Sequence, residues 1–427
     1  MKKYHPYVCL MAALLFFART ANAQPMQPVQ PTTGPGSDQP VYSSVTEFDY
    51  GTNANADGFW IFEPTGPTPD SANLVVFIHG WGETNLKFYG AFIDRIVRAG
   101  NIVICPRYQK TVDINYSTYT DSCARGLQRA LDTLQLPGHV KPRLYNYFIL
   151  GHSMGGVLTA NITMKYQYYN LPKPLAAFSM QPGADVTGLV LPDYSGFPAD
   201  VKYLIEIGSD DAIVDSTTGK LLFYQTTAVP TTHKNLVRQI ADNHGTPAIT
   251  ATHYEPFSIT SNNIYDDGES NVITLVSTLT PPDAVDFYCY WKLWDALVDC
   301  ALHGNNCDVA FGDTYAQKYM GQWSDGTPLT PLYVLPQATE TAIAPLADNK
   351  LVAVWPNPAP AGNFTVSITG INGNPVFELY DIRGRKVMEQ KLTVANTVIN
   401  TPLPGGMYFY QIANAAGIAA KGKLIVK

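Results

Sequence analysis

Short continuous runs of apolar residues alternate along the chain with longer segments whose apolar positions recur every three or four residues. The first pattern is typical of strands buried on both faces of a sheet, and the second of amphipathic helices. The continuous runs predict strands over 74–78, 102–105, 147–150, 175–180, 203–207 and 235–241. The periodic segments predict helices over 88–99, 118–134, 155–169, 216–226 and 284–302. Such repeated strand–helix units predict an α/β fold, a mostly parallel sheet with helices on both faces.

The pattern changes at both ends of this region. The first residues carry two lysines, then an apolar run over 8–18 and the sequence Ala21-Asn22-Ala23, which together are typical of a secretory signal peptide. Residues 24–43 are rich in Pro, Gln, Gly and Thr without apolar periodicity, which predicts a linker. From residue 350 on, short alternating strands are separated by Gly-Asn and Pro-Gly turns, which predict a small all-β sandwich.

These changes divide the chain into segments. The prediction is a signal peptide over 1–23, a linker over 24–43, an α/β catalytic domain over 44–335, a second linker over 336–348 and a β-sandwich domain over 349–427. After the signal peptide, no run of apolar residues reaches the length of about 18 that a membrane-spanning helix needs.

The net charge and the cysteines indicate which partners and bound metals the protein is expected to have. The net charge is −7, and removal of the basic signal residues Lys2, Lys3 and Arg19 makes it −10, which argues against a nucleic-acid partner. The cysteines include no Cys-x-x-Cys pair and their spacings do not repeat, so we expect no metal centre. In an exported protein, Cys300 and Cys307, which flank a short loop, are the first candidates for a disulfide. Cys105 with Cys123 is the second candidate pair.

Candidate chemistry begins with the sequence GHSMGG at 151–156. It follows directly on the predicted strand 147–150 and opens the predicted helix 155–169, which is the context that a nucleophilic serine on a sharp strand-to-helix turn requires. We therefore expect Ser153 to be a nucleophile. The alternative interpretation is a serine that caps the helix in a glycine-rich turn.

An acyl-transfer nucleophile needs N–H donors for the oxyanion. The backbone N–H of Met154, which follows the serine, is the first candidate. The sequence HGWG at 79–82 follows the strand 74–78, where a second donor belongs, and the backbone N–H of Trp81 is the candidate there. His79 directly follows a buried strand, so we interpret it as structural.

The sequence YLIEIGSDD predicts a buried strand that ends in two acidic residues. An acid at the carboxyl end of such a strand is placed to reach an imidazole across the sheet. The Gly-x-x-Asp spacing from Gly208 favours Asp211 over Asp210 as that acid. The alternative is that both carboxylates only cap the next helix.

The base is expected to follow the acid in the chain. His152 is excluded because neighbouring side chains on such a turn diverge, and His233 precedes its strand and therefore lies at the wrong edge of the sheet. His244, in DNHG, directly follows the strand 235–241, whereas His253 lies further on in THYEP. Strand position favours His244, and the stiffening by Pro256 favours His253. We predict His253 as the base and keep His244 as the alternative.

In this order, HGWG, GHSMGG, GSDD and a late histidine resemble the α/β-hydrolase superfamily. The sequences NIVICPRYQ, HYEP, YWKLWDALVDC and MGQWSDGTP are similar to a subfamily of secreted bacterial esterase- or lipase-like hydrolases. There, HYEP is similar to the His-Phe-x-Pro around the catalytic histidine, which is a second reason to prefer His253. The resemblance implies a Ser153, Asp211 and His253 triad and no cofactor.

The last segment carries its own resemblance. WPNPA, ELYDIRGRKV, GGMYFYQI and the terminal KGKLIVK are similar to the type A C-terminal sorting domain of the type IX secretion system of Bacteroidetes. The family usually has Tyr-Pro-Asn-Pro, and Trp355 stands in place of the tyrosine here. The resemblance implies contact with the secretion machinery and a secreted or surface-attached protein. A sandwich that binds carbohydrate or a partner is the alternative.

Together these observations lead us to expect a secreted serine hydrolase that cleaves carboxylic esters. A serine peptidase or amidase would use the same triad, and a non-catalytic surface binding protein would keep the fold without the chemistry. The interval between Ser153 and Asp211 is too short for a large lid, so we expect an open site suited to a surface-presented or polymeric ester. The insertion 257–283 is a candidate for a partial cover.

Overall fold

The computed structural model describes residues 24–51, 56–110, 114–183, 188–266, 268, 281–337, 351–369, 373, 375–381, 385–414 and 417–427. The chain divides into two compact units, Met1–Gln337 and Ala338–Lys427. The predicted signal peptide and most of the predicted linker over 336–348 lie outside the described residues.

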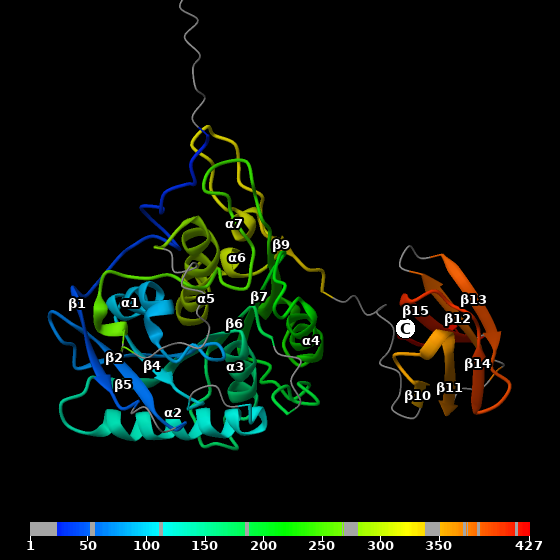
Figure 1. Cartoon of the computed structure of the whole chain (residues 1–427). Coiled ribbons are helices and arrows are strands. Elements are labelled where there is room, and N and C mark those ends of the chain that lie inside the picture. Colours follow the sequence, from blue (N-terminus) through cyan, green and yellow to red (C-terminus); the bar gives the residue numbers. More distant parts are fainter. Residues whose placement is uncertain are drawn as a thin grey trace, which may run out of the picture. The chain divides into compact units, whose positions relative to one another are not determined.

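A nine-stranded sheet is the centre of the amino-terminal unit (Figure 1). Its strands are β1 Ser44–Asp49, β2 Phe59–Thr65, β3 Ser71–Ile78, β4 Asn101–Pro106, β5 Lys141–His152, β6 Ala176–Met180, β7 Lys202–Gly208, β8 Lys234–Gln239 and β9 Tyr333–Val334. Their order in the sheet is β1-β2-β4-β3-β5-β6-β7-β8-β9. Strands β3 to β8 run parallel, and β1, β2 and β9 pair antiparallel at the edges.

Helices cover both faces of this sheet, with α1 and α5 on one face and α2, α3 and α4 on the other (Figure 1). The helices are α1 Gly90–Arg98, α2 Tyr119–Gln135, α3 Met154–Met164, α4 Thr217–Gln225, α5 Trp291–His303, α6 Cys307–Ala310 and α7 Tyr315–Lys318. Single helical turns lie at η1 Leu86–Tyr89, η2 Tyr116–Thr118, η3 Thr231–His233, η4 Asn263–Tyr265 and the π-helical η6 Asp286–Tyr290.

Alternation along the strands builds two cores. On β3, Leu74, Val76 and Ile78 face the core beneath α2 and α3, whereas Val75 and Phe77 face the core beneath α1 and α5. Because successive side chains of a strand point to opposite faces, a continuous apolar run is what a sheet buried on both sides needs.

The six predicted strands coincide with β3 to β8, and the mostly parallel sheet with helices on both faces is confirmed. The predicted helix over 284–302 starts with the π-helical turn η6 before α5 begins. Strands β1 and β2 were outside the strand–helix pattern, because they add to the edge as an antiparallel pair without a crossover helix between them.

Residues 24–43, which their composition predicts to be a linker, are bound to the amino-terminal unit at several points. Thr246 N–H donates to the Pro25 carbonyl at 2.7 Å, and Gly36 N–H donates to Asp295 Oδ2 at 2.8 Å. Arg95 donates to the carbonyl of Ser37, which is buried. Individual backbone and side-chain groups make these contacts, including Gln27, and the segment forms no helix or strand.

The predicted disulfide between Cys300 and Cys307 is confirmed. The second candidate pair is wrong, since Cys105 and Cys123 are both free and buried. Cys105 lies in the core beneath α1 and α5, and Cys123 lies in the core beneath α2 and α3. The sheet therefore separates the two thiols, and a disulfide requires Cβ atoms about 4 Å apart.

The carboxy-terminal unit is a sandwich of two antiparallel sheets, which confirms the predicted all-β domain. One sheet has the order β10 Leu351–Trp355, β11 Asn363–Thr369 and β14 Asn396–Asn400, and η7 Pro360–Gly362 precedes β11. The other has the order β13 Lys386–Lys391, β12 Val376–Asp381, β15 Gly406–Asn414 and β16 Gly417–Val426. Phe364, Phe377 and Ile412 are among the residues of its apolar core. Within the described part of the whole chain, we find no helix with the length and apolarity to cross a membrane.

Candidate active site

Ser153 occupies the turn between β5, which ends at His152, and α3, which begins at Met154. Its backbone has φ 56° and ψ −123°, a conformation that non-glycine residues rarely adopt and that costs on the order of 1–3 kcal/mol. Ser153 N–H donates to the Met180 carbonyl of the neighbouring strand at 3.0 Å. A strained, tethered serine at the carboxyl end of a central strand is the geometry that the nucleophile prediction requires.

Two glycines make this turn fit. A Cβ on Gly151 would lie 2.4 Å from the Gly155 carbonyl oxygen, and a Cβ on Gly155 would lie 2.1 Å from the Ile78 carbonyl oxygen. Both distances are far below van der Waals contact. The absent side chains therefore let the turn close on itself and let α3 lie against β3.

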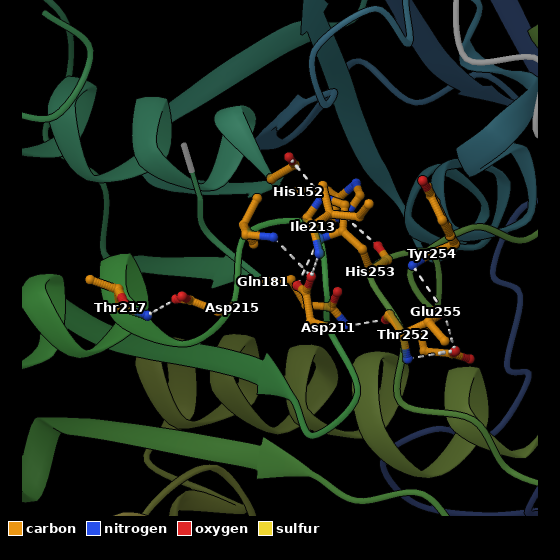
Figure 2. A network of polar contacts seen from close by, with 12 residues as sticks. His152, Gln181, Asp211, Ile213, Asp215, Thr217, Thr252, His253, Tyr254 and Glu255 are labelled. Atoms are coloured by element: carbon orange, nitrogen blue, oxygen red, sulfur yellow. Dashed lines mark hydrogen bonds and ion pairs between the residues drawn. The ribbon is translucent and has the colours of Figure 1, made fainter. Parts of the chain in front are cut away.

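Ser153, His253 and Asp211 lie in one line of hydrogen bonds. His253 Nε2 is 2.9 Å from Ser153 Oγ, and His253 Nδ1 is 2.7 Å from Asp211 Oδ2. Asp211 lies in the loop that begins after β7 ends at Gly208, and its other oxygen, Oδ1, accepts the N–H groups of Ile213 at 2.9 Å and Val214 at 3.0 Å (Figure 2). The structure thus brings together the three residues that the sequence predicts.

The surroundings set the charge of the acid and the base. Burial acts to raise the pKa of Asp211, but the hydrogen bonds from His253, Ile213 and Val214 outweigh it, so that pKa lies below its ordinary value. Burial lowers the pKa of His253; Asp211 raises it, and the nearby His152 lowers it further, with a net shift below the ordinary value. At neutral pH the site therefore holds a carboxylate and a neutral imidazole that is ready to accept a proton.

The loop that carries His253 is closed by polar contacts (Figure 2). Glu255 Oε1 accepts the Thr252 N–H at 3.0 Å and the Thr252 hydroxyl at 2.8 Å. Gln181, which follows β6, donates from Nε2 to the Thr252 carbonyl at 2.8 Å. The sequence predicts that Pro256 stiffens this loop. It does not predict these hydrogen bonds, which hold the loop as well.

The alternative residues lie in other surroundings. His244 Nε2 is 2.8 Å from Asp325 Oδ2, and this pair is exposed. Asp210 is exposed and accepts the hydroxyl of the neighbouring Ser209 at 2.9 Å. The ring nitrogens of His79 face the carbonyls of Gly80 at 2.7 Å and Arg107 at 2.9 Å, as a structural histidine would.

The two predicted oxyanion donors lie at the ends of two adjacent parallel strands, β3 and β5. Met154 is the first residue of α3, so its N–H has no carbonyl within the helix to bond. Trp81 is fixed by a hydrogen bond from its indole Nε1 to the Tyr119 hydroxyl at 3.1 Å. The role of these N–H groups stays a prediction.

His152 turns away from the nucleophile, as the diverging side chains of the turn predict. Its side chain is fully buried, with Nδ1 2.8 Å from the Tyr89 hydroxyl and Nε2 2.9 Å from the His253 carbonyl oxygen. The Tyr89 hydroxyl donates to Glu83 Oε2. Sequence reasoning missed Glu83 and Tyr89, and the only signal was the position of Glu83 directly after HGWG.

The strand order, the strained serine after β5, the carboxylate after β7 and the late histidine define the class of the amino-terminal unit, which is the α/β-hydrolase fold. Residues 47–187 match a family model described as chlorophyllase, and residues 353–427 match one described as secretion system C-terminal sorting domain. The amino-terminal unit therefore has the α/β-hydrolase fold and is similar to chlorophyllases over residues 47–187, and residues 353–427 carry a C-terminal sorting domain of the type IX secretion system. No curated protein matches the chain.

The two matches cover different parts of the prediction. The chlorophyllase match includes Trp81, Ser153 and Met154 but ends before Asp211 and His253. The sorting domain indicates export to the cell surface or the medium and contact with the secretion machinery.

Among the described residues, no group of three or more histidines, cysteines or acidic residues is placed to hold a metal ion.

Proposed function

We propose that the amino-terminal unit is a serine hydrolase that cleaves carboxylic esters through an acyl-enzyme. The observation that carries the proposal is the chain of hydrogen bonds that joins Ser153, His253 and Asp211, with Ser153 on a strained turn. The match to chlorophyllases supports an ester as the substrate. The proposal includes a signal peptide over 1–23, which would deliver the chain to the export route that the sorting domain completes.

In the proposed mechanism, Ser153 Oγ attacks the ester carbonyl while His253 Nε2 takes its proton. Asp211 holds the Nδ1–H tautomer of His253 and stabilises the imidazolium that forms. The N–H groups of Met154 and Trp81 are the donors for the oxyanion. His253 then protonates the leaving alcohol, and a water molecule activated by the same imidazole releases the carboxylic acid and restores Ser153.

The experiment uses the full-length secreted protein and a fluorophosphonate probe, which phosphonylates activated serines. Wild type should be labelled and should hydrolyse short and long acyl esters. Ser153→Ala should lose labelling and reduce kcat by roughly a millionfold without changing the unfolding temperature. Ser195→Ala is the matched control, because the Ser195 hydroxyl is exposed and donates only to the nearby Asp193 at 2.7 Å. This variant should keep both labelling and turnover.

The same assay decides between the alternatives. Labelling together with faster hydrolysis of peptide amides than of esters would make the protein a peptidase or amidase. A folded wild type that neither takes the probe nor turns over any ester or amide would overturn the enzyme proposal and favour a binding protein. Comparison of soluble esters with an ester presented on a polymer surface tests the expectation of an open site.

A further inference from the structure

A second polar network lies beneath the proposed site and consists of Glu83, Tyr89 and His152. All three side chains are buried, with exposed fractions of 1% for Glu83 and 0% for Tyr89 and His152. They come from three separate elements, namely the loop after β3, the turn η1 and the end of β5. The mechanism proposed above uses none of these three side chains.

Hydrogen bonds connect the three side chains to one another and to the backbone of His253. The His253 carbonyl only accepts, so His152 Nε2 carries a proton and donates to it at 2.9 Å. The Tyr89 hydroxyl donates to Glu83 Oε2, and the Tyr89 oxygen lies 2.8 Å from His152 Nδ1. This arrangement places His152 and Glu83 on either side of the Tyr89 hydroxyl, with His152 Nδ1 3.5 Å from Glu83 Oε2. Burial acts to raise the pKa of Glu83, but the contacts with His152 and Tyr89 outweigh it and the pKa is lowered.

The same network reaches the loop of the predicted oxyanion donor. Gly80 N–H donates to Glu83 Oε2 at 2.9 Å and to the Tyr89 oxygen at 3.0 Å. A Cβ on Gly80 would lie 2.2 Å from Glu83 Oε2, so the glycine allows the carboxylate to sit against the loop. Gly80 is the residue before Trp81, and Glu83 therefore fixes the backbone from which the Trp81 N–H projects.

Aromatic rings enclose the network. Phe257 packs edge-on against His152 and Tyr89, with ring centroids 5.4 Å and 5.3 Å apart. The rings of His152 and His253 lie 4.7 Å apart (Figure 2). Polar contacts in such a water-poor setting are electrostatically stronger than at the surface, and a broken one is correspondingly costly.

From these contacts we infer that Glu83, Tyr89 and His152 are positioning residues that tie the oxyanion loop, the nucleophile turn and the base loop into one unit. In this unit, His152 binds the main-chain carbonyl of His253, whereas Asp211 binds the ring of His253. His253 is thus fixed from two sides, by Asp211 on Nδ1 and by His152 on the backbone. This inference rests on the proposed function.

The test uses two amide substitutions of His152, each of which places an amide nitrogen at only one of the two ring-nitrogen positions. In His152→Gln the amide nitrogen takes the place of Nε2 and keeps a donor for the His253 carbonyl. In His152→Asn the amide nitrogen takes the place of Nδ1, and that donor is lost. We expect His152→Asn to reduce kcat by about 10- to 100-fold with an unchanged KM, since small displacements of a reacting group have effects of this size. His152→Gln should recover most of the loss.

A double-variant cycle with Tyr89→Phe adds a second readout. If Tyr89 acts through His152, the kcat loss of the double variant will be smaller than the product of the two single losses. His303→Asn, at an exposed histidine at the end of α5, is the matched control and should behave as wild type. Unfolding temperatures identify variants that fail to fold, and kcat is compared only between folded ones.

The outcomes separate the two levels of the proposal. An active wild type with His152→Asn as fast as wild type, or with equal losses in His152→Asn and His152→Gln, would overturn the positioning role. Independent losses in the double-variant cycle would also overturn it. A wild type without esterase activity or probe labelling would instead refute the proposed function itself.

Discussion

Two of the histidine–aspartate pairs in the described part of the chain have nearly the same contact distance but opposite surroundings. His253 Nδ1 lies 2.7 Å from Asp211, and these side chains are 4% and 1% exposed. His244 Nε2 lies 2.8 Å from Asp325, and these side chains are 40% and 41% exposed. Distance alone therefore does not distinguish a candidate catalytic pair from a surface ion pair.

Burial and a third group make the difference. The His253 ring has its second nitrogen 2.9 Å from Ser153 Oγ, and its backbone carbonyl is held by His152. The hydrogen bond from His244 lowers the pKa of Asp325 to about 2. Solvent screens this exposed pair, and neither residue contacts the proposed nucleophile Ser153. Removal of each partner should therefore have very different consequences at the two sites.

The largest effect is expected from the two histidines. His253→Ala should reduce kcat by roughly four to six orders of magnitude, because Ser153 loses the base that takes its proton. His244→Ala should leave kcat and KM unchanged. Ester hydrolysis by purified variants with matched unfolding temperatures measures both. A reversed result, with activity lost in His244→Ala, would reassign the base.

The two aspartates give the next effect. Asp211→Asn should reduce kcat by roughly 10⁴-fold, since an amide at this position favours the wrong tautomer of His253. Asp325→Asn at the surface pair is the matched control and should have no effect on turnover. Asp210→Asn tests the neighbouring carboxylate, and a larger loss there than in Asp211→Asn would contradict the assignment of the acid.

The pH dependence of turnover sharpens the same comparison. His253 acts as a base only when neutral, and its pKa is lowered from the ordinary 6.5. Activity should therefore persist as the pH falls through 6.5 and disappear only as the pH falls through the lowered pKa of His253. Asp211 acts to raise that pKa, so Asp211→Asn should move the acid limb of kcat/KM to still lower pH. An acid limb at or above 6.5 in wild type would contradict this assignment.

Local patterns in the sequence predicted much of this site. GHSMGG and GSDD each depend on one strand end, and the continuous apolar runs located both strands. The choice between His244 and His253 depends on the path of the chain after β8. Asp242 and Ile249 form an antiparallel bridge that turns the chain back, and Asp210 N–H then donates to the Ala251 carbonyl at 3.0 Å. This return brings residue 253 to the end of β7, and no local pattern encodes it.

Contacts between distant segments account for the other differences. Glu83 and Tyr89 belong to no motif, and their role becomes visible only where three loops meet. The composition of residues 24–43 predicts a linker, but composition does not report individual hydrogen bonds such as that from Gly36 to Asp295. Cys105 and Cys123 could be assigned to opposite cores only once the faces of β4 and α2 were known.

Asp286 is a buried carboxyl group that belongs to neither histidine–aspartate pair, and its substitution gives the smallest predicted effect. Asp286 Oδ2 accepts the Asp283 N–H at 3.0 Å, but Oδ1 has no hydrogen-bond partner within the described parts of the chain. Burial, together with the charge of Asp283, raises the pKa of Asp286 well above its ordinary value. An acid whose pKa is raised on folding contributes its full stability below the unfolded-state pKa and loses it as the pH rises through the folded-state pKa.

Asp286→Asn removes this loss because an amide does not ionise, and its oxygen still accepts the Asp283 N–H. We expect the free energy of unfolding of the variant, relative to wild type, to rise as the pH increases from acidic to mildly alkaline values, by about 1.4 kcal/mol for each unit by which folding raises the pKa of Asp286. Thermal unfolding at several pH values measures the gain, and Asp132→Asn on the exposed side of α2 is the matched control. A difference between variant and wild type that is constant with pH would show that folding does not raise the pKa of Asp286. Asp211→Asn should behave in the opposite way, because the pKa of Asp211 is lowered on folding and its carboxylate contributes stability that is present at neutral pH and lost on acidification.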